Sequence, residues 1–399
     1  MAVESADAPV AGARRALLGL RVALALFSLG ALIGGPWDML WHMQSAFESF
    51  WSPPHLFIYG MTAAAVAVAA VLAARPPLRA AFGPTIKVPG IRPPLPASLV
   101  FLGLGLGVVI LSGVLDEIWH AAFGLDETRF SAPHAMFGWG LFVAIMGFGS
   151  ARLSLEMAGP APIGRLEAFT FAFLTIAFSL YAFLLAFLVY PTEETVRAIS
   201  GLPAIASQPG AAHTFRIYEA FGVDRSHPIF AVLSAAWAAC AIRTAGLYGE
   251  AKWLAPAAAG VASALYAALW FAFAARLGTA GDYRAWAPLP LFPAMLVLML
   301  AGRWRRSDAL SVGAAAATVG LLCIVLWPPY TAEWNRAGVA LVAVTAVLAF
   351  AAAWSASARV EAAVVKPSAR RALWPPLGAG LGFPLLFGVV DLFMRSSVA

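Results

Sequence analysis

Two short stretches of this sequence each contain one aspartate and two histidines at nearly the same spacing. The first is WDMLWHMQSAFESFWSPPH (37–55) and the second is LDEIWHAAFGLDETRFSAPH (115–134). The residues concerned are Asp38, His42 and His55 in the first set and Asp116, His120 and His134 in the second. Each aspartate precedes the first histidine of its set by one helical turn, so the two side chains project from one helix face. The second histidine follows after a gap of 12 residues in the first set and 13 in the second.

Prolines near the second histidine of each set predict how the third side chain joins the first two. Pro53 and Pro54 stand just before His55, and Pro133 stands just before His134. Because proline is favoured in the first turn of a helix, each of these histidines is expected to begin a new helix. Each set then spans a helical hairpin that brings its three side chains to one depth. Two neutral imidazoles and one carboxylate suit a divalent transition metal such as iron, copper or zinc.

The composition indicates what kind of protein positions these side chains. Of the 399 residues, 61% are hydrophobic and only 12% are charged, and the mean hydropathy is +0.82. A water-soluble domain of ordinary size cannot bury that much apolar surface. The sequence therefore predicts an all-α, polytopic transmembrane helical bundle in a lipid bilayer. We assign the net charge of +6 to a cytoplasmic face that meets anionic headgroups, with no nucleic-acid partner.

Apolar runs of roughly 18 to 25 residues, each long enough to cross about 30 Å of hydrocarbon, predict about eleven spanning helices. They lie near residues 15–37, 55–74, 96–121, 133–151, 166–190, 227–246, 252–275, 286–302, 309–327, 336–357 and 373–394. The connections placed inside carry 17 of the 26 basic residues. By the positive-inside rule, the amino terminus is cytoplasmic and the carboxyl terminus is outside. Both Asp-His-His sets then lie near the outer, periplasmic face of a bacterial-type inner membrane.

Two other interpretations, in which no Asp-His-His set binds a metal ion through all three residues, also account for some of these side chains. A charge-assisted Asp–His pair could serve only to fix the register of two helices. Haem b would need one histidine from each of two facing helices and no carboxylate at the iron, so Asp38 and Asp116 argue against it. Three ionisable groups that converge at membrane depth are costly unless they are paired, which favours a functional site.

The chain is expected to divide into two parts. Residues 1–160 would form a four-helix membrane unit that holds both sets, and residues 161–399 a seven-helix extension with an outer loop at 191–226. His213 and His227 in this second part repeat the 13-residue gap, with Asp224 between them, but no acid precedes His213 by one turn. These three residues are candidates for a third metal site or a proton relay, and a degenerate repeat is the alternative.

The two stretches resemble the C subunit of the copper membrane monooxygenases, the family of the particulate methane and ammonia monooxygenases. That subunit carries an Asp-x3-His-x12-His set and, further on, an Asn-x3-His-x13-His set. DMLWHMQSAFESFWSPPH and DEIWHAAFGLDETRFSAPH give both spacings in the same order, although Asp116 stands where the family has asparagine. The resemblance covers about residues 20–150. It implies that one copper is bound by the first set and another by the second.

The resemblance also implies a function, partners and supporting residues. The chain would be a copper-dependent monooxygenase, or its metal-binding subunit, that acts on a small hydrophobic substrate with dioxygen. The implied partners are other monooxygenase-type subunits, including a cupredoxin-like periplasmic one, and a homo-oligomer is also open. The residues expected to support the ligands or deliver protons are Glu48, Glu117, Asp126 and Glu127. The alternative is a copper-handling membrane protein for storage, delivery or transport, so the sequence leaves open whether the chain is an enzyme.

Overall fold

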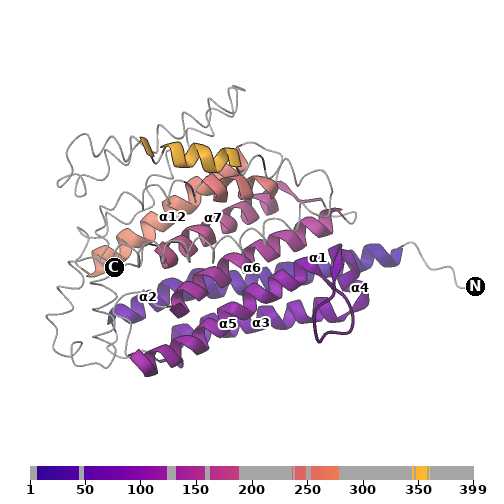
Figure 1. Cartoon of the computed structure of the whole chain (residues 1–399), viewed down its shortest axis with the longest axis horizontal. Helices are drawn as coiled ribbons and strands as arrows, with labels where there is room; N and C mark the ends of the chain where they lie inside the picture. Colours follow the sequence, from indigo (N-terminus) through magenta and orange to yellow (C-terminus); the bar gives the residue numbers. More distant parts are fainter. Residues whose placement is uncertain are drawn as a thin grey trace, which may run out of the picture. The chain divides into compact units, whose positions relative to one another are not determined.

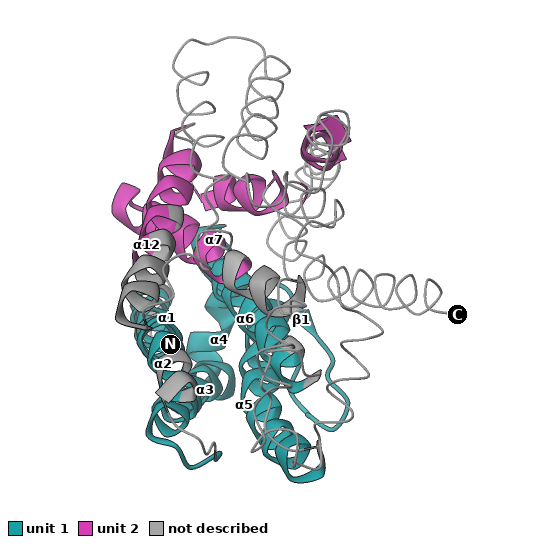
Figure 2. Ribbon diagram, turned by 90° about the vertical axis from the view of Figure 1, so that its left-hand side faces the viewer, with its two compact units in different colours: residues 1–162, 189–222, 364–399 teal, residues 163–188, 223–363 magenta. Residues whose placement is uncertain are grey.

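The computed structural model is mostly helical, as the all-α prediction requires (Figure 1). It describes residues 7–44, 49–123, 132–157, 162–187, 236, 239–248, 253–277, 344–345, 347–356 and 359. The chain divides into two compact units, which Figure 2 colours separately. The first consists of residues 1–162, 189–222 and 364–399, and the second of residues 163–188 and 223–363. The predicted outer loop 191–226 lies outside the described residues.

Four helices among the described residues are long and apolar enough to cross a membrane. They are Ala11–Asp38, Pro53–Ala74, Ala97–Ala122 and Met136–Met157. They coincide with the first four predicted spans, which supports an integral membrane protein. Three of the other predicted spans, at 286–302, 309–327 and 373–394, lie outside the described residues.

The first unit begins with a continuous helical segment that changes its winding before it reaches Asp38. Its parts are α1 (Asp7–Leu29), the π-helical segment η1 (Gly30–Gly34) and α2 (Gly35–Gln44). Such π-helical turns inside α-helices occur frequently at functional sites. Gly34 lies so close to α3 (Pro53–Ala74) that a methyl group in its place would overlap Ile58. Glycine therefore allows the two helices to approach each other one turn before Asp38.

Helices α5 (Ala97–Phe123) and α6 (Ala132–Met157) form an equally close pair. A methyl group at Gly105 would overlap the backbone of α6 at Ala144, and one at Gly147 would overlap the backbone of α5 at Leu102. In its most apolar 18 residues α6 is 78% buried, against 28–50% for the other three spans. Helix α6 is therefore the most buried of these four helices, and the other three keep a larger share of their apolar residues exposed.

The connection between α3 and α5 contains a small β-ladder that the sequence did not predict. It consists of α4 (Pro76–Arg79), η2 (Ala80–Phe82), β1 (Thr85–Ile86) and β2 (Leu95–Pro96). The strands pair antiparallel, with Thr85 opposite Pro96 and Ile86 opposite Leu95. Gly90 in the reversal between them has a φ of 81°, a conformation that glycine adopts without steric cost. The pairing of β1 with β2 depends on this reversal of the chain at Gly90.

The second unit contains α7 (Arg165–Phe187), the 3₁₀-helix η3 (Gly246–Tyr248) and α12 (Leu254–Leu277). Helices α7 and α12 pack against each other and lie where spans were predicted at 166–190 and 252–275. The Tyr248 ring is buried and stacks on Phe171, with ring centroids 5.3 Å apart. The described parts of this unit thus form a helical core of their own.

Candidate metal centre

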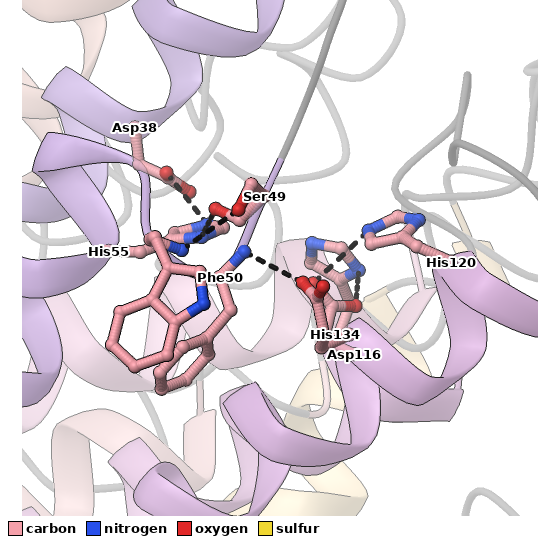
Figure 3. Close-up of polar contacts among 9 residues, drawn as sticks. Asp38, Ser49, Phe50, His55, Asp116, His120 and His134 are labelled. Atoms are coloured by element: carbon pink, nitrogen blue, oxygen red, sulfur yellow. Dashed lines mark hydrogen bonds and ion pairs between the residues drawn. The ribbon is translucent and has the colours of Figure 1, made fainter.

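Four helix ends of the first unit carry the residues of the two predicted sets. Asp38 lies in the first turn of α2, toward the carboxyl end of the continuous helical segment that begins with α1, and Asp116 lies about two turns before the carboxyl end of α5. His55 and His134 lie in the first turns of α3 and α6. Helix α3 packs against the α1–α2 segment and against α5, and α5 packs against α6. The two sets therefore face each other across a short distance in Figure 3.

The first set contains a direct contact between its aspartate and its last histidine. The Nε2 atom of His55 lies 3.0 Å from Oδ1 of Asp38, and both side chains are largely buried. Pro53 and Pro54 occupy the first two positions of α3, which confirms the predicted helix start just before His55. His42 lies in α2 one turn after Asp38, but its side chain is not among those described.

The hydrogen bond at Nδ1 of His55 determines the protonation of Nε2, the nitrogen that contacts Asp38. The Nδ1 atom lies 3.0 Å from the backbone carbonyl oxygen of Ser49. A carbonyl oxygen only accepts hydrogen bonds, so Nδ1 must carry the hydrogen, and in a neutral imidazole Nε2 then has a lone pair. A lone pair directed at the carboxylate of Asp38 is repulsive unless a proton or a metal cation lies between them. The Ser49 carbonyl thus fixes the orientation of the His55 ring, and a hydrogen bond of this kind is common for histidines that bind metals in other proteins.

The second set gathers two histidines around one carboxylate. The Nε2 atom of His120 lies 3.2 Å from Oδ2 of Asp116, and the Nδ1 atom of His134 lies 3.5 Å from Oδ1. The Asp116 residue is only 8% exposed. The predicted placement is therefore confirmed: the pair on α5 meets the histidine at the start of α6.

Two contacts join the first set to the second. The carboxylate oxygen Oε2 of Glu117 accepts a hydrogen bond of 2.8 Å from the backbone N–H of Phe50, which lies just before α3. The ring of Tyr59, one turn after His55, lies against Gly113 of α5 so closely that a methyl group there would overlap it. The two sets therefore lie next to each other, and these two contacts connect the helices that carry them.

The donor types suit a transition metal, but the present arrangement is that of ion pairs. Among the described side chains, no three His, Cys, Asp or Glu residues form a group that could hold a metal ion. The imidazole nitrogens face carboxylate oxygens directly, which is the arrangement expected when protons carry the positive charge. Ligation by the second set would involve Asp116, His120 and His134, and the first set would need His42 beside Asp38 and His55.

No family model, curated protein or solved structure matches the chain. The geometry of the two sets is therefore the basis for any assignment of function, together with the resemblance in their spacing.

The remaining predicted site residues lie outside the described part of the chain. They are Glu48, Asp126, Glu127, His213, Asp224 and His227. Sequence reasoning in turn missed Ser49, Phe50 and Tyr59. The carbonyl of Ser49 and the N–H of Phe50 act through the backbone, so their side-chain types gave no signal. Tyr59 follows His55 by one turn, and this spacing was the available indication that its ring would lie beside the site.

Proposed function

We propose that the chain is an integral membrane copper-binding protein whose two Asp-His-His sets each hold one copper ion. The observation that carries this proposal is the contact of His55 Nε2 with Asp38 Oδ1 at 3.0 Å, while Nδ1 is engaged by the Ser49 carbonyl. That arrangement requires a cation between the imidazole and the carboxylate. A proton satisfies it in the ion pair, and a divalent metal would satisfy it when His42 completes the set.

The second set supports the same proposal independently. Asp116 is a buried carboxylate on a membrane-spanning helix, and burial of such a group costs several kcal/mol unless a positive charge compensates it. His120 and His134 approach its two oxygens from different helices. A metal bound by these three groups would replace two protons and still neutralise the carboxylate.

The choice of copper rests on the spacing resemblance, because the donor set itself would also accept iron or zinc. Copper supplies one-electron redox chemistry and the activation of dioxygen when it is bound. The residues of this chain would hold it in place, keep the histidines neutral and exclude water through the apolar helices around the site. The corresponding activity is that of a copper-dependent monooxygenase, or of its metal-binding subunit, on a small hydrophobic substrate.

Copper storage, delivery or transport is the second candidate function. A transport path requires ligands at successive depths of the membrane. The described ligands instead all come from helix ends on one side of the first unit. This arrangement favours a fixed site over a transport path.

The proposal also includes the number and orientation of the spanning helices. We infer about eleven spanning helices in a bacterial-type inner membrane, with the amino terminus in the cytoplasm and both copper sites near the periplasmic face. The excess of basic residues in the alternate connections supports this orientation. A cupredoxin-like periplasmic subunit would then reach the sites from outside, and a homo-oligomer is compatible with the exposed apolar faces.

Metal analysis of protein purified in a mild detergent tests the proposal. The wild type is expected to retain copper, and the variant with both His42→Ala and His120→Ala to lose it from both sets. If the wild type holds no more metal than this double variant, the proposal fails. Consumption of dioxygen with a reductant and a hydrophobic substrate then separates the oxygenase from a copper-handling protein, which would bind copper without this turnover.

A further inference from the structure

A short backbone turn ahead of α3 connects the two Asp-His-His sets. The N–H of Phe50 donates a hydrogen bond to Oε2 of Glu117 across 67 positions of the sequence, at 2.8 Å. Glu117 directly follows Asp116 on α5, so this bond joins the helix of the second set to the turn that leads into the first.

The same turn holds the ring of His55. The carbonyl oxygen of Ser49 accepts the backbone N–H of Ser52 at 2.8 Å and also faces Nδ1 of His55 at 3.0 Å. The N–H of Trp51 donates to the Ser49 hydroxyl oxygen at 3.1 Å. The position of one carbonyl group therefore decides which ring nitrogen carries the hydrogen and where Nε2 points.

Few other contacts in the described part of the chain fix this turn. Trp51 is 70% exposed, and Phe50 stacks on Tyr59 with ring centroids 5.4 Å apart. Pro53 and Pro54, which follow the turn, have no backbone N–H to donate. Within the described residues, the bond to Glu117 is the polar contact that ties the turn to a helix other than α3.

We propose that Glu117 is a positioning residue for His55. Through the N–H of Phe50 it holds the Ser49 carbonyl against Nδ1, and so directs Nε2 of His55 to Asp38 of the same set. This role is geometric: in the contacts described, the Glu117 carboxylate accepts a hydrogen bond from Phe50 and does not contact the ring of His55, His120 or His134. The effect of Glu117 on copper affinity rests on the proposed function, whereas its effect on the orientation of the His55 ring does not.

Three substitutions of Glu117 distinguish the effect of its acceptor oxygen's position from the effect of its negative charge. Glu117→Gln keeps an acceptor oxygen at the same reach but removes the charge. Glu117→Asp keeps the charge but withdraws the acceptor by one methylene, and Glu117→Ala removes both. Glu156→Ala, near the carboxyl end of α6, is a matched control for the loss of an acid at a helix end.

The first measurement is the ¹⁵N resonance pair of the His55 ring in the full chain, labelled at histidine in detergent and assigned with His55→Ala. We expect Glu117→Ala and Glu117→Asp to move the Nδ1 and Nε2 chemical shifts of His55 toward each other, as in a ring that exchanges between its two tautomers. Glu117→Gln and Glu156→Ala should leave them unchanged. Unchanged His55 signals in Glu117→Ala would overturn the proposal, and so would a Glu117→Gln variant that behaves like Glu117→Ala while Glu117→Asp behaves like the wild type.

The second measurement is the copper affinity of the first set, titrated in a His120→Ala background that disables the second. Loss of a group that orients a metal-binding histidine typically weakens binding by about 10- to 100-fold. We expect roughly 10-fold for Glu117→Ala and Glu117→Asp, and no change for Glu117→Gln. If the ring signals shift as described while the wild-type chain binds no copper, the proposed function fails and the positioning role stands.

Discussion

The Nε2 atom of His55 and the Oδ1 atom of Asp38 lie 3.0 Å apart, although 16 residues separate the two in the sequence. Gly34 lets η1, which leads directly into α2, approach α3 at Ile58. Asp38 lies one turn beyond Gly34, and His55 lies one turn before Ile58. A close helix crossing thus sets the geometry of the first set.

Removal of the carboxylate charge should affect metal binding more than folding. In Asp38→Asn the amide N–H₂ can donate to a neutral Nε2 of His55, so the melting temperature without metal should change little. The copper affinity of the first set should fall at least about 10-fold, because an anionic ligand has been lost. The measurement is a copper titration in the His120→Ala background, with Glu156→Gln as the control. An unchanged affinity would show that Asp38 is not a ligand.

A methyl group at Gly34 should destabilise the first unit. Because it would overlap Ile58 in a close-packed crossing, Gly34→Ala is expected to cost about 1–3 kcal/mol. Gly60→Ala, on α3, is the matched control, since a methyl group there meets no atom within 4 Å. Its expected effect is neutral or stabilising by roughly 0.5–1 kcal/mol, because alanine is the better helix former. Thermal unfolding in detergent followed by circular dichroism checks both, and equal melting temperatures would contradict the prediction.

Because Gly113 and Tyr59 are in contact, substitutions at these two positions should have non-additive effects on the free energy of unfolding. Gly113→Ala is expected to destabilise the protein by about 1–3 kcal/mol, since the methyl group would overlap the tyrosine ring. In a Tyr59→Ala background the same substitution should cost much less. A double-mutant cycle of unfolding free energies measures the difference, expected at about 1 kcal/mol or more. Gly107→Ala on the same helix, where a methyl group has open space, should show no coupling to Tyr59.

The buried Tyr248 predicts a loss of stability at alkaline pH. Burial raises the pKa of the Tyr248 phenol to about 12, against a smaller opposing effect of the nearby Thr175. Between about pH 10 and pH 12 the unfolded chain releases this proton while the folded chain retains it, so stability falls as the pH rises. The contribution lost over this window is up to roughly 3 kcal/mol. Denaturation at several alkaline pH values should therefore show a steeper decline for the wild type than for Tyr248→Phe.

The helices and the spacing of the Asp-His-His residues could be predicted from the sequence because both are local properties. The lengths of the apolar runs predicted the spans that the structure shows at 53–74 and 97–122. The one-turn spacing of Asp116 and His120 predicted their contact, and the prolines predicted where α3 begins. Each of these inferences needs only helix periodicity and the backbone chemistry of proline.

The contacts that hold the site could not be predicted, because they act through the backbone or through shape. A carbonyl at Ser49 and an N–H at Phe50 are present whatever the side chains are. A glycine such as Gly34 or Gly113 could equally be a flexible position, until a neighbouring helix shows that a methyl group would not fit.

The sequence by itself therefore determined that this is a helical membrane protein with two repeated Asp-His-His sets, since hydropathy and spacing are written along the chain. The tertiary structure decided which atoms meet: Nε2 of His55 with Asp38, both histidines of the second set with Asp116, and Phe50 with Glu117. These pairings depend on how closely helices pack and where a turn presents its backbone. Both are properties of the assembled bundle, set by contacts between segments far apart in the chain.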